Sequence, residues 1–124
     1  MRAIRYHAYG PDAPKLEDVA VPEPAAGEVL VRVRCASVNP VDWKIADGTY
    51  RLLAKGGLPR IMGSDFAGEV AAAGPGVARW ASGDRVMGFI DPFARSAGTF
   101  AEFVNVPEEF VMTRPEGIDD VLGA

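Results

Sequence analysis

The chain has 124 residues, 48% of them hydrophobic, which suits one compact domain with a single core and argues against disorder. Thirteen Lys and Arg stand against 17 Asp and Glu, so the formal net charge is −4 and no basic cluster is available for nucleic acid. No apolar run approaches the roughly 20 residues of a membrane-spanning helix, so neither nucleic acid nor membrane is expected as a partner.

Cysteine usage and the first residues bear on the compartment. Cys35 is the only cysteine, which excludes an intrachain disulfide and a thiolate zinc cluster and fits a reducing compartment. Residues 1–6 alternate polar and apolar side chains, unlike a signal peptide with its charged segment and apolar core. We therefore expect a soluble, cytoplasmic protein that begins with a strand.

The first half of the chain predicts three strands. Residues 1–6 and 16–21 flank a turn rich in glycine and proline, which is typical of an antiparallel hairpin with a loop of more than two residues. Residues 29–36 are the clearest strand, because valines and a cysteine on one face alternate with two arginines on the other.

A short helix is predicted to begin after Asn39 and to end near Gly48. Asn39 can cap the helix, Pro40 suits its first position, and Asp42 stands where the acid of a capping box reaches back. Residues 50–58 contain two adjacent glycines and predict a helical turn and a loop.

Strand patterns return at residues 65–73, 85–89 and 100–106, each bounded by glycine, proline or polar residues. Five or six strands with only short helices predict a mainly β fold, a small barrel. Residues 90–98 form a loop that we expect over the mouth of the barrel. Residues 118–122 begin an amphipathic helix with acids in its first turn.

Closely spaced glycines mark residues 63–70, 74–77 and 83–86, where tight turns and close backbone approach are expected. The Gly-Pro-Gly turn at 74–76 is not a dinucleotide fingerprint, because position 79 is no glycine and a strand follows in place of a helix. The phosphates of a dinucleotide would have to be held elsewhere.

These three glycine segments, together with residues 39–42, resemble the medium-chain dehydrogenase/reductase superfamily, specifically its zinc-free quinone oxidoreductase (zeta-crystallin-like) branch. The resemblance covers essentially the whole chain. It implies a GroES-like, partly open β-barrel with short helices as the catalytic, substrate-side domain over residues 1–114. Residues 115–124 would then start the linker helix to a Rossmann domain that is absent from the chain.

In that branch a hydride passes from NADPH or NADH to a quinone or an α,β-unsaturated carbonyl compound. The resemblance implies that Asn39 lies beside the nicotinamide and the substrate carbonyl, with Asp42 close by, and that Tyr50 faces the substrate. Ser64 and Asp65, with Asn39, would contact the cofactor. The expected catalytic residues are thus Asn39, Asp42 and Tyr50, and the expected cofactor contacts are Asn39, Ser64 and Asp65.

Structural roles compete with these assignments. Asn39 and Asp42 have the spacing of a helix cap, and Tyr50 can be a half-buried tyrosine with its hydroxyl in water. Ser64 can serve local backbone groups, and Asp65 can form an ion pair with Arg85 or another arginine. Capping and a catalytic role are compatible for Asn39.

No zinc is expected. The zinc-dependent members of the superfamily carry a cysteine and a His-Glu pair at the positions that Asn39, Ser64 and Asp65 occupy here. Neither an amide nor a hydroxyl is a usual zinc ligand. This departure from the zinc pattern favours the quinone oxidoreductase branch.

The leading hypothesis is an N-terminal catalytic-domain fragment of an NAD(P)H-dependent quinone or enone oxidoreductase, inactive alone. A second is a standalone GroES-like binding or co-chaperonin-like module without enzymatic activity, since fold does not carry function. A third is a zinc dehydrogenase with displaced ligands. The physiological substrate, the choice between NADH and NADPH and the oligomeric state, homo-oligomers included, stay open.

Overall fold

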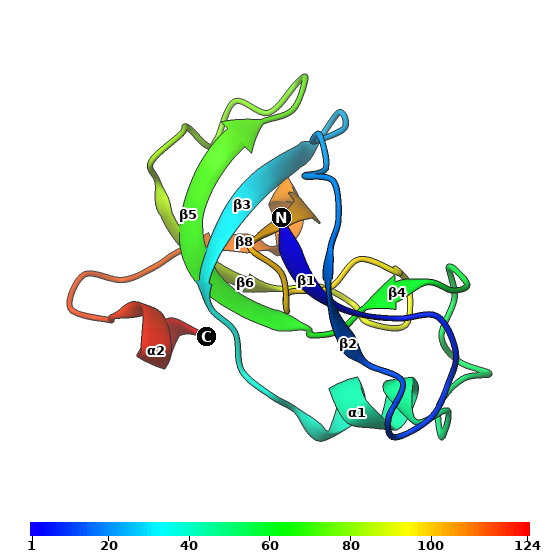
Figure 1. Cartoon of the computed structure of the whole chain (residues 1–124). Helices are drawn as coiled ribbons and strands as arrows, with labels where there is room; N and C mark the ends of the chain where they lie inside the picture. The colour runs from blue at the N-terminus through cyan, green and yellow to red at the C-terminus, as the bar shows by residue number, and fades with distance from the viewer.

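Eight strands and two short α-helices make up the computed structural model, which describes residues 1–124 (Figure 1). In chain order the elements are β1 (Arg2–Tyr6), β2 (Lys15–Asp18), β3 (Glu28–Cys35), α1 (Pro40–Ala46), β4 (Arg60–Ile61), β5 (Asp65–Ala73), β6 (Arg85–Phe89), β7 (Phe103–Pro107), the 3-10 turn η1 (Glu108–Phe110), β8 (Val111–Thr113) and α2 (Asp120–Gly123). The mainly β prediction with short helices is confirmed.

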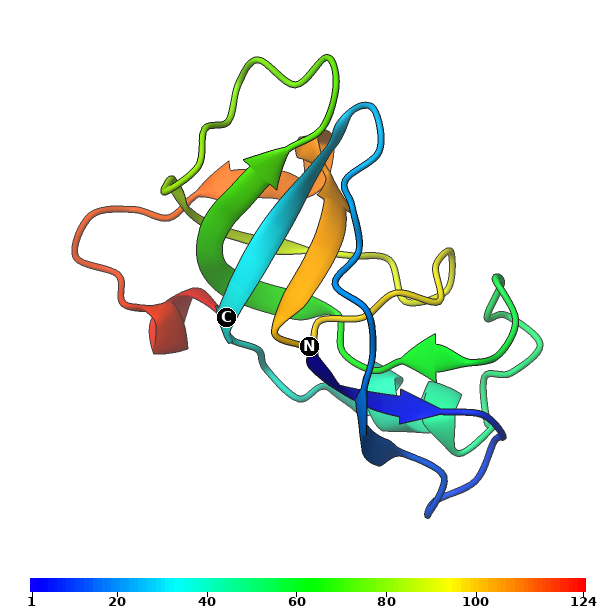
Figure 2. The same cartoon turned by 45° about the horizontal axis from the view of Figure 1, so that its top comes forward.

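The strands form two antiparallel sheets. The larger has the order β7-β3-β5-β6-β8, and Figure 2 shows β3 between β5 and β7. The smaller has the order β2-β1-β4, which includes the predicted hairpin of the first two strands. The sheets meet at one isolated bridge between Ala3 and Ala101, so the barrel that they outline is only partly closed.

The strands β5 and β6 match the predicted ranges residue for residue, whereas β7 begins three residues later than predicted. Phe100 leaves the predicted strand because its backbone serves the other sheet: its N–H donates to Met62 O, and its carbonyl accepts from Ile4 N–H, both at 2.8 Å. The strands β4 and β8 were not predicted. They have two and three residues, too few to show an alternation of polar and apolar side chains in the sequence.

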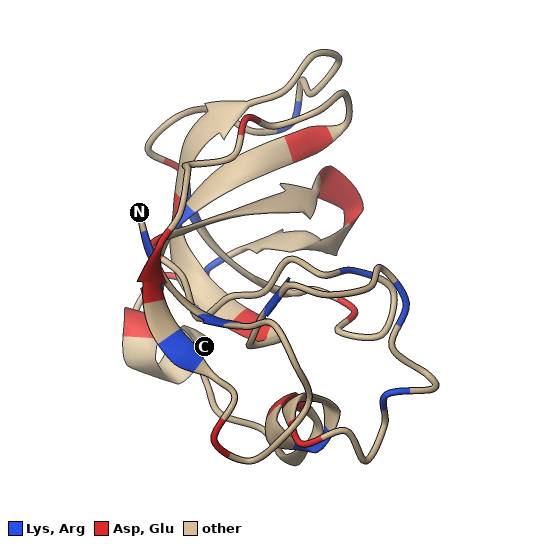
Figure 3. Ribbon diagram, turned by 45° about the vertical axis from the view of Figure 1, so that its right-hand side comes forward, with Lys and Arg blue, Asp and Glu red and all other residues tan.

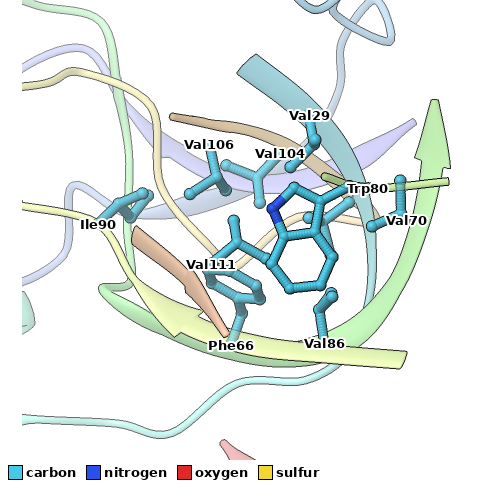
Figure 4. Close-up of a cluster of buried hydrophobic side chains, with 10 residues drawn as sticks. Val29, Phe66, Val70, Trp80, Val86, Ile90, Val104, Val106 and Val111 are labelled. Atoms are coloured by element: carbon cyan, nitrogen blue, oxygen red, sulfur yellow. The ribbon is translucent and has the colours of Figure 1, made fainter. Parts of the chain in front are cut away.

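Ten buried hydrophobic side chains, most of them from strands of the larger sheet, form the core cluster (Figure 4). Its members are Val29, Val31, Phe66, Val70, Trp80, Val86, Ile90, Val104, Val106 and Val111. The predicted alternation along β3 is interrupted at its start, where Val29, Leu30 and Val31 are all buried. The pairing of β3 with β5 shifts register between Leu30 and Val31, an irregularity that disturbs the regular ladder at this point.

Close backbone approach explains two of the glycines. A Cβ atom on Gly68 would lie 2.1 Å from Arg32 O on the adjacent strand. Gly63 has a φ of +95°, and a Cβ atom there would lie 2.4 Å from Thr99 Oγ1. Only glycine allows β5 to begin this near to its neighbours, which confirms the close approach expected in residues 63–70.

Charged residues of both signs are interspersed along the chain, as Figure 3 shows. Several form ion pairs on the surface, including Arg2 with Glu102 and Arg34 with Glu69. Hydrogen bonds from Arg34 lower the pKa of the Glu69 carboxyl from its ordinary 4.5, and the positive charge of Arg34 acts in the same direction. None of the helices has the length and apolar character needed to cross a bilayer.

This lowered pKa predicts that stability falls in acid. Because the pKa of Glu69 is lower in the folded than in the unfolded chain, its contribution is present above about pH 4.5 and lost as the pH falls through the folded-state pKa. We expect Glu69→Gln to lose less stability than the wild type between about pH 6 and about pH 3, measured by urea unfolding. An equal loss in both proteins would contradict the prediction, and Glu116→Gln, on an exposed turn, is the control.

Candidate active site

The residues expected to form the site gather where three elements meet. β3 ends at Cys35, α1 begins at Pro40, and β5 begins at Asp65. Because β3 and β5 are antiparallel, with Cys35 opposite Ala67, the end of one strand lies beside the start of the other. A polar network of five residues, Ser37, Asn39, Asp42, Ser64 and Asp65, occupies this junction.

The outer layer of the network consists of Ser37, Asn39 and Asp65, all of them half-buried. Asn39 Nδ2 donates to Asp65 Oδ2 at 2.5 Å and to Ser37 Oγ at 3.2 Å. Ser37 Oγ donates to the same carboxylate oxygen at 3.0 Å. The side chain of Asn39 therefore ties the start of α1 to the first residue of β5.

The inner layer consists of Asp42, which is 4% exposed, and Ser64, which is 1% exposed. Asp42 Oδ2 accepts from Asn39 N–H at 2.7 Å, as expected of a capping box, and Asp42 Oδ1 accepts from Ser64 Oγ at 2.6 Å. The predicted cap by Asp42 is thus confirmed. Two hydrogen bonds to the buried carboxylate fix the beginning of α1 against β5.

The alternative role of Asp65, an ion pair with Arg85 or another arginine, is not found, since none of the ion pairs includes Asp65. In the ladder of β5 and β6, Asp65 stands opposite Phe89, while Arg85 stands opposite Glu69, four residues away. Four residues along a strand span about 13 Å, too far for an ion pair. Asp65 takes its hydrogen bonds from Asn39 and Ser37 instead.

Ser37 was missed by the sequence analysis. It belongs to no motif, and its only signal is a polar residue two positions before a predicted helix cap. Its role depends on Asp65, which is 28 residues away in the chain.

Tyr50 lies apart from this network, at the opposite end of α1, where its N–H donates to Lys44 O at 3.0 Å. Its ring centroid is 6.1 Å from that of Phe93, with the rings tilted by 58°. Lys44 Nζ lies 5.7 Å from the Tyr50 ring centroid, within cation–π range. The structure therefore brings Asn39, Asp42, Ser64 and Asp65 together but puts Tyr50 in a separate aromatic group.

The donor set indicates which ligands the junction can hold. No group of three or more His, Cys, Asp or Glu residues is arranged to hold a metal ion. The half-buried atoms are an amide, a hydroxyl and one carboxylate, which suit a polar uncharged group such as a carboxamide or carbonyl. Neither helix begins after a glycine-rich loop that could cradle a pyrophosphate. The junction therefore offers hydrogen-bonding groups for a neutral polar ligand and no cradle for a phosphate.

Comparison with known proteins defines the class. The sequence model of the alcohol dehydrogenase GroES-like domain matches residues 25–116, and the chain belongs to this family. Within it, the relatives place the chain in the quinone oxidoreductase branch of the medium-chain dehydrogenase/reductase superfamily. Over its full length the chain is 39% identical to a chloroplastic quinone-oxidoreductase homolog of Spinacia oleracea and 40% identical to a quinone oxidoreductase of Rattus norvegicus.

Solved structures agree with this placement. The quinone oxidoreductase from Coxiella burnetii superimposes with a TM-score of 0.90 at 31% identity and covers 100% of this chain. The Escherichia coli quinone oxidoreductase complexed with NADPH gives a TM-score of 0.84 at 25% identity over 97% of the chain. The chain spans 38% and 36% of the two relatives above and 40% and 35% of these two structures. The predicted GroES-like fold and family are confirmed.

The inner layer predicts a stability role for Asp42. In Asp42→Asn, an NH₂ group replaces one carboxylate oxygen and cannot accept from the donor that faces it. We expect a loss of about 1–3 kcal/mol in the free energy of unfolding, measured with urea. Asp18→Asn, at an exposed position of β2, should stay within about 0.5 kcal/mol of the wild type. Equal effects of the two substitutions would refute the role of the buried bonds.

Proposed function

We propose that the chain is the substrate-side catalytic domain of a zinc-independent, NAD(P)H-dependent quinone or enone oxidoreductase. The observation that carries the proposal is the half-buried trio of Ser37, Asn39 and Asp65 in a chain of the quinone oxidoreductase branch. Relatives named quinone oxidoreductases, one of them solved with NADPH, support the cofactor and substrate class. The lone Cys35 supports a cytoplasmic setting.

In this proposal Asn39 orients the reactants. Its amide is held by Asp65 and Ser37, so its direction is set before a ligand arrives. Asp42 and Ser64 keep the first turn of α1 in place beneath it. A nicotinamide cofactor, when bound, supplies the hydride. The neutral amide of Asn39 aligns polar groups by hydrogen bonds without adding a charge.

Tyr50 is proposed to face the substrate. Its phenol can donate a hydrogen bond to a carbonyl oxygen on which negative charge develops, and with Phe93 it offers a surface for a flat ring. Because Tyr50 belongs to a different group from Asn39, the substrate would extend between the two ends of α1. That helix has seven residues and a length of about 10 Å.

The dinucleotide phosphates are proposed to be held by a separate Rossmann domain. The first turns of α1 and α2 contain Asp42 and Asp120, and negative charge there disfavours a phosphate. We propose that residues 1–114 form the catalytic domain and that residues 115–124 begin the connection. Asp119 supports its helix, since its side chain accepts from Leu122 N–H at 2.8 Å.

This division of labour predicts weak cofactor binding by the 124 residues alone. We expect no saturation in a titration that follows NADPH fluorescence up to about 100 μM, because the pyrophosphate site is missing. The quinone oxidoreductase of Escherichia coli, solved in complex with NADPH, is the positive control. Micromolar binding by this chain alone would overturn the division.

A chimera tests the chemistry. Residues 1–114 would replace the matching part of a two-domain quinone oxidoreductase, and NADPH oxidation by 1,4-naphthoquinone would be followed. We expect activity in the chimera and a loss of about tenfold or more in kcat for Asn39→Ala, because the oriented amide that aligns the reactants is removed. Val38→Ala, at the exposed neighbouring position, should retain kcat. An inactive but folded chimera, or an Asn39→Ala variant with full activity, would contradict the proposal.

A further inference from the structure

Arg60 is a buried cation without an acidic partner. It stands at the start of β4 with 3% of its surface exposed. None of the ion pairs of the chain includes it. Buried arginines are almost always paired with a carboxylate, because an isolated charge loses its hydration on burial. The groups that accept hydrogen bonds from the buried guanidinium therefore indicate the role of Arg60.

Those partners are three main-chain carbonyl groups from two different loops. Nη1 donates to Lys55 O, and Nη2 donates to Pro92 O at 2.5 Å and to Arg95 O. Lys55 belongs to the loop between α1 and β4, and the other two belong to the loop over residues 90–98. A planar guanidinium presents several donors in a rigid fork, so one side chain spans both loops.

Further contacts join the same two loops. Lys55 N–H donates to Phe93 O at 2.6 Å, and from the adjoining strand β4 Ile61 N–H donates to Ser96 O at 2.9 Å. A Cβ atom on Gly56 would lie 3.1 Å from Ser96 N, so the two backbones touch. The loops thus form one unit, with Arg60 as its central donor.

This unit adjoins the candidate site. Arg60, Asp42 and Pro92 line the same narrow cavity, together with Tyr6 and Gly63. Burial raises the pKa of the Tyr6 phenol, and the positive charge of Arg60, which lines the same cavity, opposes that rise. Arg60 therefore adjoins Asp42 of the inner layer without forming an ion pair with it.

We propose that Arg60 is a positioning residue that clamps the loops 50–58 and 90–98 together and so holds Tyr50 and Phe93 as one aromatic wall. The wall favours substrates with a flat ring over small open-chain carbonyl compounds. This use of the wall rests on the proposed function, whereas the clamp itself does not. Without the guanidinium, three carbonyls lose their donor and the two rings lose their fixed separation.

The clamp can be tested on the 124-residue chain by hydrogen exchange. In Arg60→Lys and Arg60→Met we expect the amides of Lys55 and Ile61 to exchange about tenfold faster or more, with β3 and β5 unchanged, since only the loop bonds are weakened. Arg51→Met, an exposed arginine of the same loop, is the matched control and should leave these rates unchanged. Unchanged protection in both Arg60 variants would overturn the clamp, as would unfolding of the whole domain in both.

The wall is tested in the chimera described above. For Arg60→Lys we expect KM for 1,4-naphthoquinone to rise about tenfold while kcat stays within about threefold, and the preference over a small open-chain enone to fall. A lowered Tm with an unchanged KM would overturn the role in substrate selection. If the unsubstituted chimera reduces no quinone, the proposed function fails, and the exchange rates still decide whether the clamp exists.

Discussion

The antiparallel pairing of β3 with β5 is the interaction on which the rest of the structure depends. It supplies Val29, Val31, Phe66 and Val70 to the core, and it requires a glycine at position 68 where the two backbones approach. Because the strands run in opposite directions, the chain leaving β3 and the chain entering β5 meet at one edge. The candidate site lies at that edge, so the contact that builds the core also assembles the polar network.

The inner and outer layers of the polar network differ in burial and in the role that we assign to them. Asp42 and Ser64 are almost completely buried and fix the start of α1, whereas Ser37, Asn39 and Asp65 retain access from outside. The capping and ligand-binding interpretations of Asn39 therefore do not compete. Its main-chain N–H is taken by Asp42 and its side chain by Asp65, so one residue anchors the helix and presents an oriented amide.

The candidate functional groups are unevenly distributed over the fold. The sheets carry few candidate groups, while the loops around α1 carry the amide, the tyrosine and the aromatic partner from residues 90–98, as expected when a rigid scaffold positions loops. Arg60 shows what such loops need in a small domain. Loops without a hydrophobic core of their own depend on hydrogen bonds to their main chain. A single buried guanidinium can donate several such bonds to main-chain carbonyl groups.

Local patterns in the sequence determined the elements with a clear period or cap: β5, β6 and α1 lie where alternation and the Asn-Pro-x-Asp start predict them. The glycine segments and residues 39–42 also carried the family resemblance, and through it Asn39, Asp42, Ser64 and Asp65 became candidate site residues. Tertiary structure alone decided the partners. Whether Asp65 meets Arg85 or Asn39 depends on the register of β5 against β6 and β3. The carbonyl groups that accept from Arg60 depend on how two loops fold back. Asn39 and Asp65, 26 positions apart, become neighbours through strand pairing, and Arg60 and Arg95, 35 positions apart, become neighbours through the packing of a loop against β4. A local sequence period encodes neither distance.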